Sequence, residues 1–395
     1  MEPINVTRPQ LPPLSNLIPL LEDIWNSGCV TNSGPYHQQF EAKLKAHLGV
    51  KNLSLLSNAT IALLATIKAL NLKGEVITSP YSFVATTHAL TWNNITPVFS
   101  DVCTHDFNIC PARVEKLITE KTTAILAVHC YGSPCNVDAL ERIADRHKLK
   151  LVFDAAHAFG VKVKGKSLSE FGDASVLSFH GTKVFNTFEG GAVVSRNQQL
   201  VEKINKLKNF GFSSEVDVDD VGINGKMSEF NAALGLLQLD YIDNFIFKRK
   251  LIYQYYVDKL GKLPGILIPF DGFRQNQIQN YSYFPIVVTP ESALTRDELY
   301  TLLKRRGINT RRYFYPIIPD FSVYRALYYA DEKNFRNARK LASAVLCLPI
   351  YPSLDKNDLI RIVSEIHDLL CKDVSHKCAT TYPLSNIDSL PIAEN

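Results

Sequence analysis

The stretch AILAVHCYGSPCNVDALERIADRHKLKLVFD, residues 124–154, decides the fold of this chain. It starts with an apolar run of strand length, Ala124–His129, and continues with a segment of helical apolar spacing, Val137–His147. A second apolar run, Leu151–Phe153, ends the stretch. Both runs are continuous rather than alternating, which is typical of parallel strands buried on both faces of a sheet. The stretch therefore predicts a βαβ unit.

The sequence on either side of this unit repeats the pattern. Short apolar runs end in small or polar residues and alternate with segments of helix length, which predicts a doubly wound α/β sheet of about seven strands. A helix is predicted near Thr60–Leu70, after the apolar run Leu53–Leu56. The further predicted strands are Leu53–Leu56, Glu75–Thr78, Thr96–Phe99, Ser175–Ser178 and Ala192–Ser195.

The outer parts of the chain predict helices and a second, smaller unit. Leu17–Trp25 and Gln38–His47 have the apolar spacing of helices on the outside of the fold, and Glu229–Lys262 predicts a helix pair. We therefore predict a large domain over residues 1–250, a smaller α+β domain over 251–378 and a loose tail over 379–395. The predicted elements of the smaller domain are Ile266–Ile268, Tyr281–Val288, Thr295–Arg306, Ala338–Val345 and Leu359–Leu370.

Composition excludes several classes of protein. Of the 395 residues, 46% are hydrophobic and 21% are charged, which is too apolar for a disordered chain. The net charge is only +4 and is scattered, so nucleic acid is a poor candidate partner. No apolar run is long enough to span a membrane, and charge and proline precede any apolar run at the N-terminus, which predicts a cytoplasmic protein. The eight cysteines have no metal-like spacing, so we predict reduced thiols and no metal site.

Two strand ends carry residues that can take part in catalysis or in binding a cofactor. Asp154 closes an entirely apolar strand, where it is either a helix N-cap or the partner of a protonated heterocycle nitrogen. Lys183 lies in the loop after the predicted strand Ser175–Ser178, where it is either a solvated charge or an amine that forms a Schiff base with an aldehyde cofactor.

A third strand end predicts a phosphate site. Ser57 and Thr60 stand where the strand Leu53–Leu56 joins a helix, and free N–H groups at a helix start favour a phosphate. Ordinary helix capping explains the same residues equally well in isolation. Ser178 adds a second hydroxyl. An acid, a lysine and a hydroxyl-bearing helix start together match the needs of pyridoxal 5′-phosphate.

With these residues in place, the sequence resembles the DegT/DnrJ/EryC1/StrS family of sugar aminotransferases, from about Leu11 to Leu370. The most specific segment is SFHGTKVFNTFEGGAVV (Ser178–Val194). It is supported by several others in the same order, which include TNSGPYHQQFE (31–41), SPYSFVATTHAL (79–90), FDAAHAFG (153–160) and GINGKMSEFNAALGLLQL (222–239). The resemblance implies the aspartate-aminotransferase fold, known as fold type I, and pyridoxal 5′-phosphate as cofactor.

The resemblance also implies roles for individual residues. Lys183 would be the Schiff-base lysine and Asp154 the partner of the pyridine nitrogen, while Phe83 would stack on the cofactor ring. His157 falls where relatives usually have a glutamine near the cofactor's phenolic oxygen. The phosphate would be held by Ala59, Thr60 and Ser178, and by Asn224 from the neighbouring subunit of a homodimer.

Some positions depart from the family pattern. The family usually has glycine at position 59 and often arginine at position 226, where this chain has Ala59 and Lys226. The segment Arg311–Phe321 also lacks a histidine that commonly follows its proline. These differences concern the phosphate and substrate contacts.

The resemblance implies transfer of an amino group from L-glutamate to a nucleotide-linked keto sugar, for O-antigen or related glycan synthesis. The wording of three segments is similar to members of the family that aminate dTDP-4-dehydro-6-deoxy-D-glucose at C4. Three alternatives stay open: C3 amination of a dTDP-3-keto sugar, amination of a UDP- or GDP-linked 4-keto sugar, and a regulator that has the fold without catalysis. A nucleotide-sugar binding protein without cofactor is a further alternative.

Overall fold

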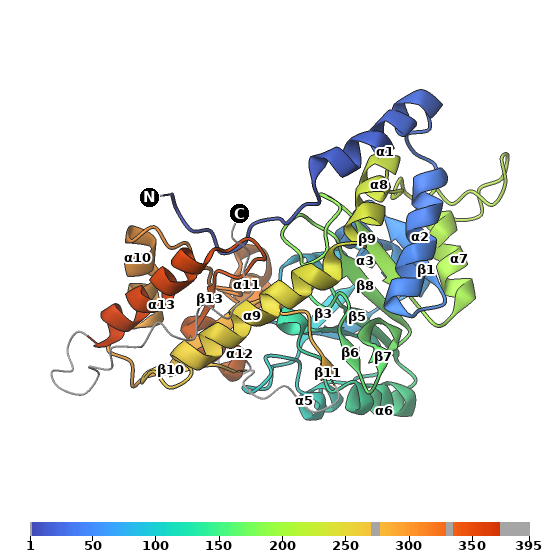
Figure 1. Cartoon of the computed structure of the whole chain (residues 1–395). Coiled ribbons are helices and arrows are strands. Elements are labelled where there is room, and N and C mark those ends of the chain that lie inside the picture. Colours follow the sequence, from blue (N-terminus) through green and yellow to red (C-terminus); the bar gives the residue numbers. More distant parts are fainter. Residues whose placement is uncertain (1, 270–276, 329–334, 372–395) are drawn as a thin grey trace.

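The computed structural model describes residues 2–269, 277–328 and 335–371, and the predicted tail lies outside these ranges. Its centre is a seven-stranded sheet in the order β1-β9-β8-β5-β4-β2-β3 (Figure 1). The prediction of an α/β fold with about seven mostly parallel strands is confirmed. The strands are β1 (Leu53–Leu56), β2 (Glu75–Thr78), β3 (Thr96–Phe99), β4 (Thr122–Val128), β5 (Lys150–Asp154), β8 (Ala174–Ser178) and β9 (Gly191–Val194).

Strand direction brings the chemically interesting residues to one edge of the sheet. β9 is antiparallel to both of its neighbours, β1 and β8, and the other pairs are parallel. All strands except β9 therefore end at the same edge, where β9 begins. In the register, Gly191 at the start of β9 lies between Leu56 and Ser178, the last residues of β1 and β8.

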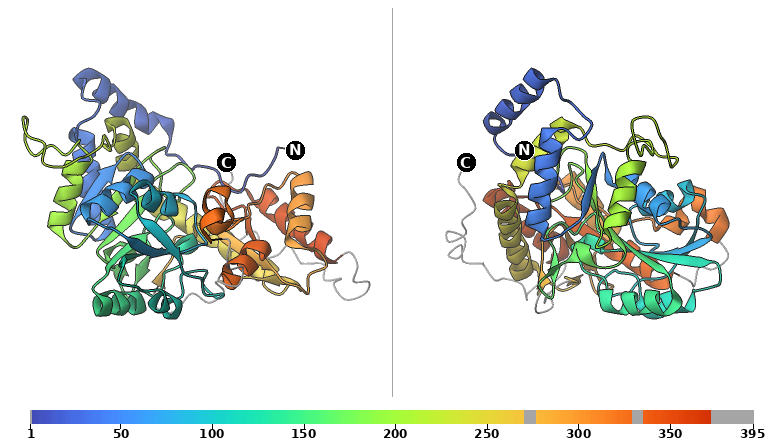
Figure 2. Two further views of the ribbon diagram at one scale, coloured as in Figure 1. Left: turned by 180° about the vertical axis from the view of Figure 1, so that it is seen from behind. Right: turned by 90° about the vertical axis from the view of Figure 1, so that its right-hand side faces the viewer.

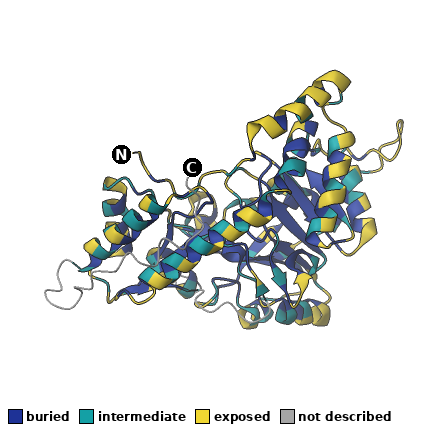
Figure 3. Ribbon diagram, viewed as in Figure 1, coloured by how far each residue is buried: buried dark blue, intermediate teal, exposed yellow. Residues whose placement is uncertain are grey.

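Both faces of the sheet are buried, as the continuous apolar runs predict. In β4, Ile125 belongs to the hydrophobic core on one face, and its neighbours Ala124 and Leu126 belong to the core on the other face. Burial of each leucine or isoleucine side chain contributes about 1.5–3 kcal/mol to the free energy of folding. Figure 3 shows the strands buried and the outer helices exposed on one side. The helices of this part are α1 (Leu14–Ser27), α2 (Pro35–Leu48), α3 (Ala59–Ala69), α4 (Ala85–Trp92), α5 (Pro111–Lys116), α6 (Val137–His147), α7 (Gln198–Leu207) and α8 (Glu229–Gln238).

A second unit is built on a three-stranded antiparallel sheet in the order β10-β12-β13. The long helix α9 (Ile242–Leu260) runs from the main core to this unit, so the predicted boundary between residues 250 and 251 falls inside a helix (Figure 1). The other elements of this unit are β10 (Ile266–Leu267), β12 (Phe284–Val288), α10 (Arg296–Arg305), α11 (Ser322–Tyr328), α12 (Arg336–Ala344), β13 (Val345–Leu348) and α13 (Lys356–Cys371).

Two smaller features complete the architecture. The N-terminal segment lies against the second unit, where Ile4 bridges Ile308 and belongs to the same hydrophobic core (Figure 2). A third small sheet joins β6 (Lys162–Val163), β7 (Lys166–Ser167) and β11 (Gln277–Ile278). Within the described ranges, no helix has the length and apolar character that crossing a membrane requires.

Candidate active site

Asp154 is the last residue of β5 and is almost completely buried. Its Oδ2 accepts a hydrogen bond from Thr86 Oγ1 at 2.7 Å, and its Oδ1 accepts one from the backbone N–H of Ala156 at 3.1 Å. Burial raises the pKa of Asp154, and the two hydrogen bonds and the charge of Lys183 oppose that rise. The residues directly after Asp154 form turns rather than the start of a helix, so the N-cap alternative is wrong. This buried acid is built to face a cation.

Lys183 lies in the loop between β8 and β9 and is half-buried. Its backbone N–H donates to the carbonyl of His180 at 2.8 Å, which closes a tight turn. Burial lowers the pKa of Lys183 to about 8, although the charge of Asp154 acts in the opposite direction. Within the part of the chain that the structure describes, no carboxylate oxygen lies within 4.0 Å of its Nζ. A lysine that is partly neutral near physiological pH can act as a nucleophile and as a proton carrier.

His157 is buried three residues after Asp154, between two aromatic rings. Its ring is parallel to that of Phe314, with centroids 5.9 Å apart, and meets Tyr283 edge to face at 4.9 Å. The backbone N–H of Tyr131 donates to Nδ1 at 3.2 Å. Burial lowers the pKa of His157 far below its ordinary value, so the imidazole is neutral. With Nδ1 as acceptor, the ring proton is assigned to Nε2, which is then a hydrogen-bond donor.

The start of α3 presents backbone N–H groups at the same edge. Asn58 caps the helix and accepts the N–H of Ile61 at 2.9 Å, so the capping residue is neither Ser57 nor Thr60. The N–H groups of Ala59 and Thr60 form the first turn, and N–H groups in that position point at anions. Ala59 is the first helical residue and has no positive φ, so alanine is accommodated where the family usually has glycine.

Gly191 fixes how closely the sheet approaches this helix start. A Cβ on Gly191 would lie 2.7 Å from the backbone nitrogen of Ala59 and 2.7 Å from the carbonyl carbon of Asn58. Only glycine therefore allows β9 to pack against the first turn of α3. The Gly190–Gly191 pair that marks the lysine loop in the sequence thus also shapes the candidate phosphate cradle.

The remaining predicted residues lie around the same edge. Ser178 ends β8 and is buried, with its Oγ accepting the N–H of His180 at 3.4 Å. The Phe83 ring is 60% exposed in the segment between β2 and α4, an unusual position for a large aromatic side chain. The backbone N–H of Ser57 donates to the carbonyl of Gly225 at 2.8 Å, and Asn224 beside it is exposed.

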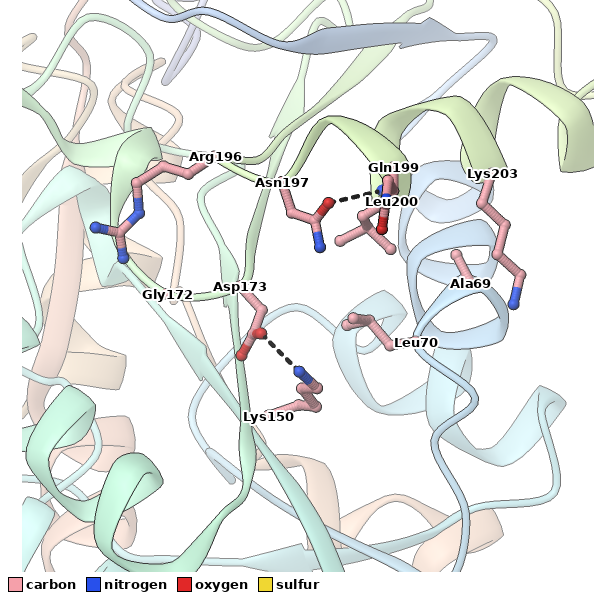
Figure 4. Close-up of a pocket in the computed structure, with 10 residues that line it drawn as sticks. All are labelled: Ala69, Leu70, Lys150, Gly172, Asp173, Arg196, Asn197, Gln199, Leu200 and Lys203. Carbon is pink, nitrogen blue, oxygen red and sulfur yellow. Dashed lines mark hydrogen bonds and ion pairs between the residues drawn. The ribbon is translucent and has the colours of Figure 1, made fainter.

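One cavity lies beside this edge of the sheet, and another lies at the opposite edge. A cavity of about 270 Å³ is lined by Phe83 and by residues of the Arg311–Phe321 segment, so that segment lies beside the candidate cofactor site. Figure 4 shows another cavity of about 420 Å³, where Lys150 and Asp173 form an ion pair at 3.0 Å. Because Lys150 begins β5 and Asp154 ends it, the cavity of Figure 4 lies at the opposite edge of the sheet and is not part of the candidate site.

These residues fit pyridoxal 5′-phosphate. A buried acid with a raised pKa suits the protonated ring nitrogen, and Lys183 without a carboxylate partner suits the aldehyde. The exposed Phe83 ring offers a stacking surface, and the α3 start offers N–H groups for the phosphate. Sequence reasoning missed Thr86 and Asn58, although both stand inside segments that it singled out. Neither side chain differs from an ordinary helix residue until the fold brings it to Asp154 or to the phosphate cradle.

Comparisons with known proteins identify the family of this chain. The model of the DegT/DnrJ/EryC1/StrS aminotransferase family matches residues 15–367. The chain is 50% identical over 368 residues to a dTDP-4-amino-4,6-dideoxy-D-glucose transaminase of Shigella dysenteriae, covering 93% of this chain and 99% of that protein. A protein of the same name from Escherichia coli is 47% identical over 361 residues, with 91% and 96% covered. A GDP-perosamine synthase of Vibrio cholerae is 31% identical over 338 residues, with 85% and 90% covered.

Solved structures show the same fold. The crystal structure of DesI in the presence of its TDP-sugar product superposes with a TM-score of 0.87 at 35% identity, covering 94% of this chain and 93% of that one. PseC of Helicobacter pylori, an aminotransferase involved in the biosynthesis of pseudoaminic acid, gives a TM-score of 0.87 at 27% identity, with 94% and 100% covered. The fold type I architecture that the sequence resemblance implies is therefore confirmed.

Proposed function

Because the chain belongs to the DegT/DnrJ/EryC1/StrS aminotransferase family, we propose that it aminates C4 of dTDP-4-dehydro-6-deoxy-D-glucose with L-glutamate as the amino donor. The products would be dTDP-4-amino-4,6-dideoxy-D-glucose and 2-oxoglutarate. The protein is a pyridoxal 5′-phosphate-dependent sugar aminotransferase. The observation that carries the choice of sugar is the 50% identity to the Shigella dysenteriae transaminase over nearly the whole of both chains.

The candidate site supplies the residues that this reaction needs. When bound, the cofactor provides an electron sink that stabilises the carbanion formed at the carbon losing its proton. Asp154 keeps the ring nitrogen protonated, and Thr86 and the N–H of Ala156 hold its carboxylate in position. Lys183, with its pKa lowered to about 8, carries the proton between the amino-bearing carbon and the cofactor.

The other residues orient the cofactor. The Nε2–H of His157 donates toward the phenolic oxygen, in the role that glutamine has in relatives, and Phe83 covers one face of the ring. Ser57, Ala59, Thr60 and Ser178 hold the phosphate at the carboxyl edge of the sheet. These assignments are supported by the convergence of all of these residues on one sheet edge.

The proposal includes a homodimer with shared active sites, in which Asn224 reaches the phosphate of the partner. Two exposed aromatic side chains support a second copy as partner: Phe188 stacks on Phe230, in the helix that follows Asn224, with ring centroids 5.5 Å apart, although both are more than a third exposed. Mixing Lys183→Ala and Asn224→Ala subunits tests this. If Asn224 acts in the partner's site, hybrid dimers contain one intact site and regain activity that neither variant has alone. Activity that stays absent after subunit exchange would refute the shared site.

The sugar is tested with the holoenzyme and purified nucleotide sugars. Glutamate should bleach the visible absorbance of the lysine-bound cofactor, and dTDP-4-dehydro-6-deoxy-D-glucose should restore it and yield a 4-amino sugar by NMR. If only a GDP- or UDP-linked keto sugar restores the absorbance, or if the product is a 3-amino sugar, the proposed substrate is wrong. If the visible absorbance of the lysine-bound cofactor never appears after cofactor is added, the protein does not act as this enzyme. In the proposed setting, a cytoplasmic enzyme supplies its product to O-antigen or related glycan synthesis.

A further inference from the structure

A cavity of about 540 Å³ lies between α2 and the residues that follow α7. Three lysines line it: Lys45 from α2, Lys208 from the end of α7, and Lys226. Glu41 is the carboxylate among the lining residues, and it pairs with Lys45 at 2.6 Å. The walls of the cavity therefore carry more positive than negative charge.

Lys208 is the most unusual of the three lysines because its side chain is inside the protein. The residue is only 4% exposed. Its Nζ donates to Ser54 Oγ at 3.0 Å and to the carbonyl of Leu55 at 2.9 Å, which are both neutral acceptors. An ammonium group has three donors, so these two bonds leave one N–H unassigned. The pKa of Lys208 is lowered to about 8, mainly by burial; the charge of Glu41 opposes this shift, and the charges of Lys45 and Lys226 add to it.

Lys226 forms no ion pair with any residue that the structure describes. Its Nζ donates to the neutral Oδ1 of Asn209 at 2.9 Å and lies 4.8 Å from the centre of the Phe210 ring. Among the described residues, the hydrogen-bond acceptors of Lys208 and Lys226 are thus neutral, and Glu41 is a nearby carboxylate that also pairs with Lys45. An anion in the cavity would relieve their mutual repulsion.

An unpartnered imidazole gives independent evidence of a ligand. His37 lines the cavity and is 3% exposed, yet its Nε2 is buried without a hydrogen-bond partner among the described residues. Its backbone N–H is engaged, since it donates to Glu229 Oε1 at 3.0 Å. Buried polar atoms in folded proteins are almost always satisfied, so this unpaired ring nitrogen in the wall of a lysine-lined cavity is a candidate for a ligand contact.

We propose that this cavity is a second anion site, which binds a phosphate or diphosphate group between His37, Lys208 and Lys226. The group comes either from a free inorganic anion or from the diphosphate of a nucleotide. The site is separate from the cofactor phosphate cradle but connected to it: Gly225 donates its N–H to the carbonyl of Lys208, and accepts the N–H of Ser57 at its own carbonyl, each at 2.8 Å. An anion held by Lys208 therefore also steadies the start of α3.

The test is calorimetric titration of sodium diphosphate into the holoenzyme at constant ionic strength, with the cofactor absorbance as a check that the cradle stays filled. Lys226→Gln removes a charge but keeps a donor for Asn209, and should weaken binding about 10-fold. Glu41→Gln removes the competing carboxylate and should tighten binding severalfold. Lys68→Gln, on the exposed face of α3, removes the same charge elsewhere and should leave the affinity unchanged.

The His37 ring gives a second readout that needs no variant. Its nitrogen resonances should shift on addition of diphosphate, because an acceptor reaches Nε2. Absence of measurable binding by the wild-type protein, or equal affinity in Lys226→Gln, Glu41→Gln and wild type, would overturn the proposal. The site does not depend on the identity of the sugar, since neither measurement requires turnover.

A competition experiment then distinguishes the two sources of the anion. If dTDP displaces diphosphate and its own affinity falls in Lys226→Gln, the cavity holds the diphosphate of a nucleotide. If dTDP and diphosphate bind together with additive stoichiometry, the cavity is a site for a free anion. Both outcomes retain an anion at His37 and the two lysines.

Discussion

Replacing Asp154 by asparagine should remove the charge of this side chain and keep its shape and hydrogen bonds. The amide oxygen can accept the N–H of Ala156, as Oδ1 does now at 3.1 Å. The amide nitrogen can donate to Thr86 Oγ1, whose own proton then turns to Ser82 Oγ at 2.9 Å. Every hydrogen bond of the carboxylate is thus replaced, and we expect the variant to fold.

The expected loss of activity is large. One preorganised electrostatic contact at a reacting system contributes about 10²–10³-fold in rate. An asparagine cannot hold the ring nitrogen protonated, so Asp154→Asn should lose about that factor in single-turnover reaction with glutamate. The rate is measured from the decay of the visible absorbance of the lysine-bound cofactor, at equal cofactor content in variant and wild type.

The apoprotein should be at least as stable as wild type, with a defined pH dependence. Burial raises the pKa of Asp154 above its ordinary value of 3.8, so ionisation of this side chain opposes folding. The wild-type protein therefore loses stability as the pH rises from that value through the folded pKa, and the variant does not. The difference in free energy of unfolding should be smallest in acid and should grow in favour of Asp154→Asn until the folded pKa is passed.

Asp101 offers a matched control. It is also a buried aspartate just beyond a strand of the same sheet, but each of its oxygens accepts backbone N–H groups: Oδ1 from Ala338 at 2.9 Å and Oδ2 from Asn337 at 3.0 Å. An amide can accept at only one of these positions, so Asp101→Asn should cost about 1–3 kcal/mol of stability and little activity per folded molecule. Activity of Asp154→Asn within 10-fold of wild type, or destabilisation like that of Asp101→Asn, would refute the reasoning.

Three further outcomes are expected. Lys183→Ala should fold and lose turnover completely, and in wild type the rate of cofactor incorporation by the apoprotein should rise with pH through about 8, because only the neutral amine attacks the aldehyde. Gly191→Ala should destabilise the protein by about 1–3 kcal/mol and weaken cofactor affinity by displacing α3, whereas Gly181→Ala, whose Cβ meets ordinary contacts at 3.6 Å, should do neither in thermal melts and cofactor titrations. His157→Gln should retain most of the steady-state rate because it keeps a donor, and His157→Leu should lose substantially more; equal rates would show that no hydrogen bond is made there.

Much of the main sheet could be predicted from the sequence because its strands are buried on both faces. The predicted strands Leu53–Leu56, Glu75–Thr78 and Thr96–Phe99 match β1, β2 and β3 to the residue. The Ala338–Val345 segment was harder, since a helix ends at Ala344 and β13 begins directly afterwards. No turn residue separates the two elements, so local sequence gives no signal of the change. The helices α4 and α7 were not predicted at all.

The candidate site was predictable in its strong residues and not in its supporting ones. Asp154 and Lys183 stand out because charge at the end of an apolar strand is expensive and therefore informative. Thr86 does not, because a threonine within a helical segment has many ordinary explanations. The same holds for His37 of the proposed anion site. Its Nε2 lacks a hydrogen-bond partner among the described residues only because of the atoms that surround the ring after folding. Contacts of this kind are set by tertiary packing, which periodicity and spacing do not encode.

The pKa shifts of Lys183 and Asp154 have one cause and opposite signs. Burial lowers the pKa of Lys183 and raises that of Asp154, so the fold drives both side chains toward their neutral forms. An ion pair between them would hold both charged, but Nζ has no carboxylate within 4.0 Å in the described chain. A protonated ring nitrogen beside Asp154 supplies the missing countercharge without recruiting the lysine. Asp154 can then stay ionised while Lys183 remains free to lose its proton, and this division of charge is what amino transfer requires of the two residues.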